Sequence, residues 1–154
     1  MADTDVNAGT LTVTITEALA VDHANGATND IDFAQTYTHT YGSIANVSKR
    51  IIKLANTNLT EVATFGSDTQ NGAFVRADVR YIRVTNLDSS DALQVGLDDE
   101  DSDAAYTSVA ADSSIIFTGT TVEGGNGGST LDNATALKVK GAANQQLEVM
   151  IASV

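Results

Sequence analysis

Cysteine, proline and tryptophan are all absent from this chain of 154 residues. Without cysteine the protein forms no disulfide framework and has no thiolate for catalysis or metal binding. Without proline it contains neither proline-rich linkers nor PxxP ligand segments. A chain of this length buries a working core without covalent cross-links, so we expect one compact domain.

Positively charged residues are scarce: 8 lysines and arginines stand against 20 aspartates and glutamates, which gives a net charge of −12. Such a surface repels nucleic-acid backbones and anionic membranes, so neither is expected as a partner. The charge also suits a partner with a basic face, but we favour the simpler interpretation of an acidic, soluble protein.

Long hydrophobic runs are missing as well. No apolar run approaches the ~18 residues that a membrane helix needs. Residues 1–9 are polar and lack the basic and apolar regions of a secretory signal, so we interpret them as a flexible N-terminal arm. The sequence therefore predicts a protein that is made in a cytoplasm, with a single folded domain at residues 10–154.

Apolar and polar residues alternate in several short segments, which is the pattern of half-buried strands. Residues 11–16 place leucine, valine and isoleucine on one face and threonine on the other. Residues 17–21 are compatible with one helical turn. Residues 33–41 place aromatic side chains and His39 on one face. This aromatic ladder suits sugar binding, and it equally suits a core or a subunit interface, which is the interpretation that we favour.

Residues 78–90 hold the most informative stretch of the chain. Tyr81, Ile82 and Val84 place apolar atoms on both faces of one strand, which predicts a position inside a sheet system. Asn86 and Asp88 then supply turn chemistry, because short polar side chains hydrogen-bond to their own backbone. We expect this strand to lie in the core.

The remaining strands follow at short intervals. Residues 49–57 repeat the basic and apolar order of residues 80–87, so we interpret the two as equivalent strands in two packed sheets. Residues 59–65 and 73–84 are predicted to form a hairpin across residues 66–72. Further strands are predicted at residues 93–97, 106–110, 113–118, 136–140 and 145–151. Roughly nine to eleven short strands predict an all-β fold, an antiparallel β-sandwich that is jelly-roll-like.

The acidic run at residues 98–103 is the best candidate for a metal site. Asp99, Asp101 and Asp103 alternate as calcium-binding carboxylates do. The EF-hand pattern fails, however, because Ala104 stands at the glycine position and Ala110 at the position of the final glutamate. We therefore favour a solvated acidic loop over a calcium site.

Other candidate sites carry weaker signals. The glycine-rich residues 124–128 lack the Gly-Lys-Ser/Thr ending of a phosphate-binding loop. His23 and His39 are the only histidines, which argues against zinc, and no Gly-x-Ser-x-Gly elbow supports a catalytic triad. We interpret Arg76, Arg80 and Arg83 as ion-pair partners or inter-subunit contacts. We assign no catalytic, cofactor-binding or metal-binding residue, and we expect the protein not to be an enzyme.

Three segments carry a resemblance to a known class of proteins. Residues 81–90 read Tyr-Ile-Arg-Val-Thr-Asn-Leu-Asp-Ser-Ser, residues 112–118 read Asp-Ser-Ser-Ile-Ile-Phe-Thr, and residues 147–153 read Leu-Glu-Val-Met-Ile-Ala-Ser. With them the chain resembles small β-rich virion proteins of tailed bacteriophages, especially marine ones. The resemblance implies a decoration (cement), head-fibre, neck or tail component, a homotrimer in the favoured form, and it transfers no functional residue.

Two hypotheses follow for the function. The first is a non-enzymatic virion protein that is made in the host cytoplasm and stabilises the capsid by adhesion, with the major capsid protein as its expected partner. The second is a carbohydrate- or receptor-binding β-sandwich that uses residues 33–41, with calcium at residues 99–103 as an option. Neither hypothesis requires a cofactor.

Overall fold

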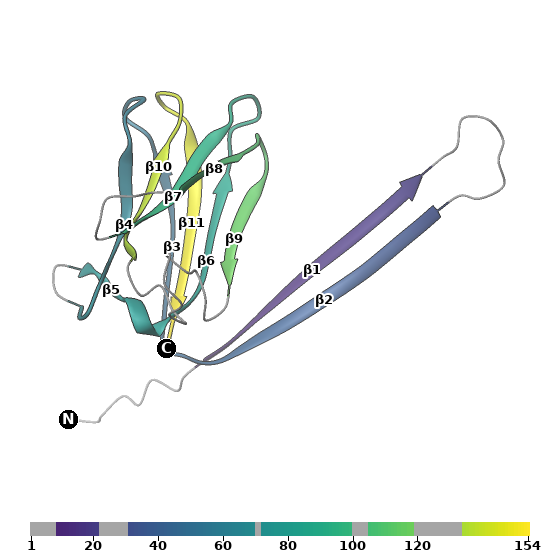
Figure 1. Ribbon diagram of the computed structural model, residues 1–154, viewed down its shortest axis with the longest axis horizontal. Helices are drawn as coiled ribbons and strands as arrows, with labels where there is room; N and C mark the ends of the chain where they lie inside the picture. The colour runs from purple at the N-terminus through teal and green to yellow at the C-terminus, as the bar shows by residue number, and fades with distance from the viewer. Residues whose placement is uncertain (1–8, 22–30, 70–71, 100–104, 119–133) are drawn as a thin grey trace.

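The computed structural model describes residues 9–21, 31–69, 72–99, 105–118 and 134–154. These residues form eleven strands and one short 3-10 helix, arranged as two packed sheets and a separate two-stranded ribbon (Figure 1). Every strand pair in the two sheets is antiparallel except a two-residue contact at one edge. The predicted all-β antiparallel sandwich is confirmed.

The two sheets of the sandwich hold nine of the strands. The four-stranded sheet has the order β3 (Asn46–Lys53), β11 (Gln146–Ser153), β6 (Val79–Asn86) and β9 (Ser114–Thr118). The five-stranded sheet has the order β5 (Phe74–Val75), β4 (Thr60–Gly66), β10 (Ala134–Lys140), β7 (Leu93–Asp99) and β8 (Ala105–Val109). The 3-10 helix η2 (Arg76–Asp78) connects β5 to β6.

The core lies between the sheets and follows from the alternation along each strand. On β6, Ile82 and Val84 face the second sheet and are 1% and 0% exposed. Side chains of this size each contribute roughly 1.5–3 kcal/mol when they leave water. The predicted core strand at residues 78–90 is therefore confirmed, because β6 lies between β11 and β9. The other large core residues are Leu54, Phe65, Leu93, Val95, Leu137, Val139, Leu147, Val149 and Ile151.

A buried polar pair holds the turns at one end of the sandwich. The side-chain amide of Asn86 donates to the carbonyl oxygen of Asp91 at 2.8 Å, and its oxygen accepts from Nε2 of Gln145 at 3.0 Å. The side-chain oxygen of Gln145 accepts from the backbone N–H of Ala142 at 2.7 Å. Both side chains are fully enclosed, so these bonds replace the water that each amide lost on folding.

Two predicted pairings are wrong. Residues 59–65 and 73–84 form no hairpin, because β4 and β6 lie in different sheets; within residues 73–84, β4 pairs only with the short β5, in parallel. The similar segments at residues 49–57 and 80–87 do not mark two packed sheets, because β3 and β6 lie on either side of β11 in one sheet. A strand that is apolar on both faces needs cover on both: for β6 the second sheet covers Ile82 and Val84, and residues of β2 cover Tyr81.

The first two strands lie outside the sandwich. β1 (Gly9–Val21) pairs with β2 (Ile31–Ile44) in an antiparallel ribbon, which we call the hairpin arm. The arm projects far from the sheets (Figure 1). The helical turn predicted at residues 17–21 is wrong, since the ladder continues to the pair Val21↔Ile31. The two sheets of the sandwich begin at Asn46, because β1 and β2 pair only with each other.

No helix in the described part of the chain is long and apolar enough to span a membrane.

Candidate functional site

The hairpin arm has two different faces. Its register pairs Val13 with His39 and Ile15 with Tyr37 on one side. The other side is lined by threonines, whose hydroxyl oxygens lie 3.4 Å apart across the strands in two successive rows. We call the first side the arm face; its described side chains are Leu11, Val13, Ile15, Glu17, Gln35, Tyr37, His39 and Tyr41.

The outer part of the arm face is open to solvent. Ile15 is 43% exposed and Tyr37 is 51% exposed, although the two lie opposite each other on neighbouring strands. A two-stranded ribbon with a bare apolar face is marginally stable in water. The outer arm face therefore gains stability when a partner covers it.

The base of the arm is firmly packed. Tyr41 and Ile44 form a small second core with Tyr81 and Ala152, on the outer face of the four-stranded sheet. The rings of Tyr41 and Tyr81 lie 6.4 Å apart between centroids, and burial raises the pKa of the Tyr81 hydroxyl. This packing anchors one end of the arm and leaves the other end free.

A bulge shapes the chain at this base. The register shifts between Gly9 and Leu11, so that three steps along β2 match two along β1. Ser43 takes a left-handed conformation there, with φ of 60°. A bulge bends and twists its strand locally, and this one lies where the arm meets the sheet.

A cleft of about 460 Å³ lies between the arm and the sheet. Its walls are apolar and polar in similar measure, with Arg83 and Ser114 among the polar groups. The other lining residues are Leu11, Thr12, Val13, Thr14, Tyr81, Ile116 and Met150. The cleft extends the arm face onto β6, β9 and β11.

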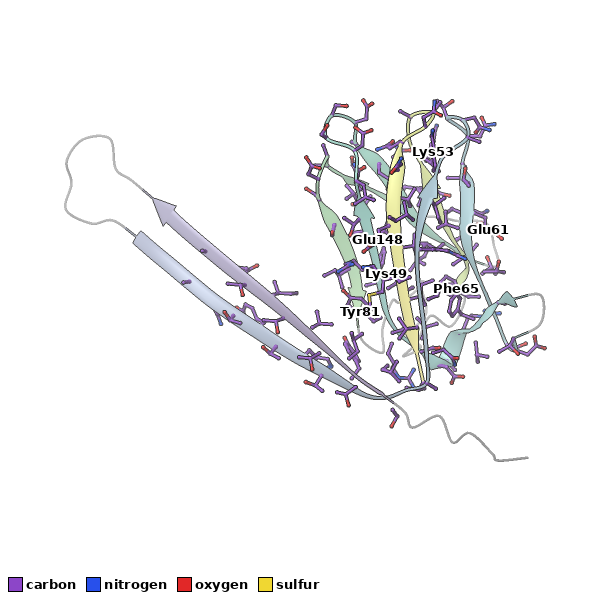
Figure 2. The ribbon with its side chains drawn as sticks, turned by 180° about the vertical axis from the view of Figure 1, so that it is seen from behind. Lys49, Lys53, Glu61, Phe65, Tyr81 and Glu148 are labelled. Atoms are coloured by element: carbon purple, nitrogen blue, oxygen red, sulfur yellow. The ribbon has the colours of Figure 1, made fainter. Side chains whose placement is uncertain are left out.

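An ion-pair network crosses the outer face of the same sheet (Figure 2). Nζ of Lys49 lies 3.1 Å from a carboxylate oxygen of Glu148, and the guanidinium of Arg83 donates to the other oxygen. Burial pushes the pKa of Glu148 up, but the hydrogen bonds from Lys49 and Arg83 outweigh it and hold the pKa below its ordinary value. The network links β3, β11 and β6 and stabilises the sheet that supports the arm.

The predicted arginine cluster is divided by the structure. Arg83 forms the ion pair just described, which confirms that interpretation for this residue. Arg80 instead donates to the carbonyl oxygen of Ala77 at 2.5 Å, and Arg76 lies on η2. The three side chains therefore do not form one anion-binding site.

The edge strand β3 carries a second exposed apolar surface. Val47 is 57% exposed and Ile51 is 64% exposed, and they alternate with Lys49 and Lys53. We call these four residues the β3 strip. Edge lysines protect a sheet from unwanted pairing, but here they flank large apolar side chains. Alternation alone does not reveal this surface, because a packed strand shows the same order of apolar and basic residues.

The acidic and glycine-rich candidates fall mostly outside the described residues. Asp98 forms an ion pair with Lys138, and this hydrogen bond raises the pKa of the lysine. Asp101, Asp103, the side chain of Asp99, His23 and residues 124–128 lie outside the description, as do residues 1–8. Within the described residues, no three histidine, cysteine or acidic side chains are grouped in a way that could hold a metal ion.

A shallow groove of about 380 Å³ lies on the five-stranded sheet. Tyr106, which is 39% exposed, lines it together with Gln94, Lys140 and Leu59. An exposed ring beside amide and ammonium groups is a combination that suits a polar ligand with apolar faces.

Comparison with known proteins adds no relative: no protein-family model, no curated protein and no solved structure matches the chain.

Proposed function

We propose that this protein is a non-enzymatic structural protein of a tailed-bacteriophage virion, specifically a capsid decoration protein that stabilises the particle by adhesion between subunits. The observation that carries the proposal is the hairpin arm, which is anchored at its base and bare on its apolar face. The virion is proposed as the location because residues 81–90, 112–118 and 147–153 resemble small phage virion proteins.

The dimensions of the arm suit contact with a neighbouring subunit. β1 has 13 residues, and at ~3.3 Å per residue it reaches on the order of 40 Å. Covering half-exposed side chains such as Ile15 and Tyr37 contributes roughly 1 kcal/mol each, about half of the value for full burial. Many such contacts on one particle add through avidity, so modest contacts are enough for a coat protein.

The order of the sandwich strands supports the predicted jelly-roll arrangement. Leaving out the short β5, β3 pairs with β11, β4 with β10, β6 with β9 and β7 with β8. The first strand thus pairs with the last and each later pairing is nested inside it, as in one long hairpin rolled into two sheets. Jelly rolls are frequent in viral capsid domains and in lectins.

The proposal includes an assembly state and a location. The protein acts on the virion after synthesis in the host cytoplasm, with the major capsid protein as its partner and a homotrimer as the favoured oligomer. The net charge of −12 opposes contact with nucleic acid, which leaves the protein on the outside of the packaged genome.

Purified particles of the phage that encodes the chain test this proposal. Mass spectrometry across a density gradient should find its peptides at constant ratio to the major capsid protein. Particles depleted of the protein should then bind the wild-type chain but not an Ile15→Thr/Tyr37→Thr variant. The matched control is Thr16→Val/Thr36→Val, which changes the opposite face of the arm outside the cleft. Absence of the peptides from the particles overturns the proposal.

Carbohydrate or receptor binding is the second candidate. The half-exposed ring of Tyr37 and the groove around Tyr106 favour it, whereas Tyr41 is packed into the base of the arm and offers no platform. Glycan-array binding by the wild-type chain that is lost in Tyr37→Ala or Tyr106→Ala would support this function. A rise in melting temperature with Ca²⁺ over EDTA would support its calcium-dependent form.

A further inference from the structure

The arm and the β3 strip lie at opposite edges of the same molecule. In the four-stranded sheet, β3 is one edge strand and β9 is the other. The arm crosses the outer face near Ile116 of β9 and leaves on that side, away from β3 (Figures 1 and 2). The two exposed apolar surfaces therefore cannot meet within one chain.

We propose that the partner of the arm is a second copy of this chain, with the arm face of one copy docked on the β3 strip of the next. This inference rests on the proposed function in one respect, that the protein acts by adhesion between subunits. The proposed function leaves the contact surfaces open. Here the two surfaces are the arm face and the β3 strip, and the partner is another copy of the protein.

The side chains on the two surfaces match in chemistry and in spacing. On the arm, Ile15 is followed two residues later by Glu17 on the same face. On β3, Ile51 is followed two residues later by Lys53. Side chains two apart share one face of a strand, so isoleucine on isoleucine places the carboxylate beside the ammonium.

The charge distribution favours the same pairing. Residues 9–44 contain no lysine or arginine, whereas the β3 strip carries two lysines: Lys49, which pairs with Glu148, and the exposed Lys53. Copies with a net charge of −12 repel one another in general, so a self-contact needs a basic surface on one side. β3 is that surface, and the cation-free arm is its complement.

The two surfaces also lie on opposite sides of each copy, because the arm leaves on the side of β9 and β3 is the other edge strand of the sheet. A contact between two different surfaces of the same chain is head-to-tail; such contacts close into a ring where the rotation between copies divides a full turn, and build an open filament where it does not. The favoured homotrimer is one ring of this type.

Cysteine cross-linking tests the contact directly, because the natural chain has no cysteine. Ile15→Cys and Ile51→Cys variants are prepared separately, mixed, and treated with a short bis-maleimide. The mixture should give a product of twice the 16.0 kDa chain mass, and each variant alone should not. The control is Ile15→Cys mixed with Leu59→Cys, an exposed site outside the strip. Cross-linking of Ile15→Cys alone overturns the proposal, because it means that arms pair with arms.

A charge exchange provides the second test, by light-scattering mass on the full chain. Glu17→Lys and Lys53→Glu should each weaken self-association by about tenfold, and the double exchange should restore it. Lys140→Glu makes the same change of charge on the other sheet and should have no effect. A monomeric wild-type chain, or single variants that associate as well as the wild type, overturns the proposal.

The two proposals fail in different ways. A chain that is monomeric in solution but present on particles removes the arm-to-strip contact and leaves the virion function. A chain that forms the cross-link but is absent from particles removes the virion function and leaves the contact.

Discussion

The hairpin arm and the sandwich are built from the same local pattern but differ in what covers it. Val84 in the sandwich is fully buried, whereas Ile15 in the arm is 43% exposed. Both side chains belong to antiparallel strands with regular alternation. The sandwich meets its apolar face with a second sheet, and the arm has none among the described residues. Alternation therefore predicts which face of a strand is apolar. It does not predict whether another part of the same chain buries that face.

The two regions also differ in how their polar groups are used. Asn86 and Gln145 connect several turns of the sandwich through enclosed hydrogen bonds. In the arm, two pairs of threonine hydroxyls meet across the ribbon, at 3.4 Å. The sandwich is thus held by bonds between distant segments, whereas the arm is held by one ladder and its base. Changes in the sandwich should affect folding, and changes in the arm should affect association.

The largest expected effect comes from a charge in the core. Ile82→Asp should unfold the sandwich, because an unpaired buried charge costs several kcal/mol. Ile15→Asp makes the same change on the arm face and should leave the circular dichroism spectrum and melting temperature of the sandwich unchanged. A folded Ile82→Asp protein would contradict the position of β6 in the centre of the core.

A smaller effect is expected at a glycine in the tight turn before β11. A Cβ on Gly141 would lie 2.0 Å from the side-chain oxygen of Gln145. Gly141→Ala should therefore displace Gln145 and lower the free energy of unfolding by about 3 kcal/mol.

The control for that glycine lies at the base of the arm. Gly42 has open space around the position of an added Cβ, so Gly42→Ala should change stability little. Urea denaturation measures both variants. Equal stabilities would mean that the Asn86–Gln145 pair does not restrain the turn.

The attachment of the arm is expected to depend on one ring. Tyr41→Ala removes the largest contact between the arm and Tyr81 and should cost about 2 kcal/mol at the base. Amide hydrogen exchange should become faster in residues 9–16 and 34–44 while β6 and β11 stay protected. Tyr37→Ala, on the exposed part of the arm, should leave the exchange at the base unchanged. Faster exchange throughout β6 would show that arm and sandwich unfold together.

The smallest expected effect is the loss of stability when the pH is lowered. The pKa of Glu148 is lowered in the folded state, so its ion pairs add stability above the pKa of the unfolded chain. This contribution is lost as the pH falls through the lowered folded pKa. The pair is partly exposed, so the loss is on the order of 0.5 kcal/mol. Glu148→Gln should reduce the acid dependence of the melting temperature, and an unchanged slope would assign that dependence to other carboxylates.

Part of the candidate site was visible in the pattern of residues. The aromatic alternation at residues 33–41 predicted a core, an interface or a sugar site, and the structure divides it: Tyr41 packs against the sheet and Tyr37 stays exposed. The β3 strip escaped prediction, because Lys-Ile alternation looks the same on an edge strand and on a covered one. Whether Ile51 is exposed depends on β3 lying at the edge of its sheet.

Local order along the chain was enough to predict most strands, the all-β class and the core position of Ile82 and Val84. Strand formation depends on neighbours one and two residues apart, so a short segment of sequence is enough to predict it. Pairing is different, because β3 joins β11 and β4 joins β10 across most of the chain. Several apolar faces could cover one another, and the arrangement that buries the most apolar surface over both sheets is the one that forms. The tertiary structure alone therefore shows which faces close the core and which remain exposed for a partner.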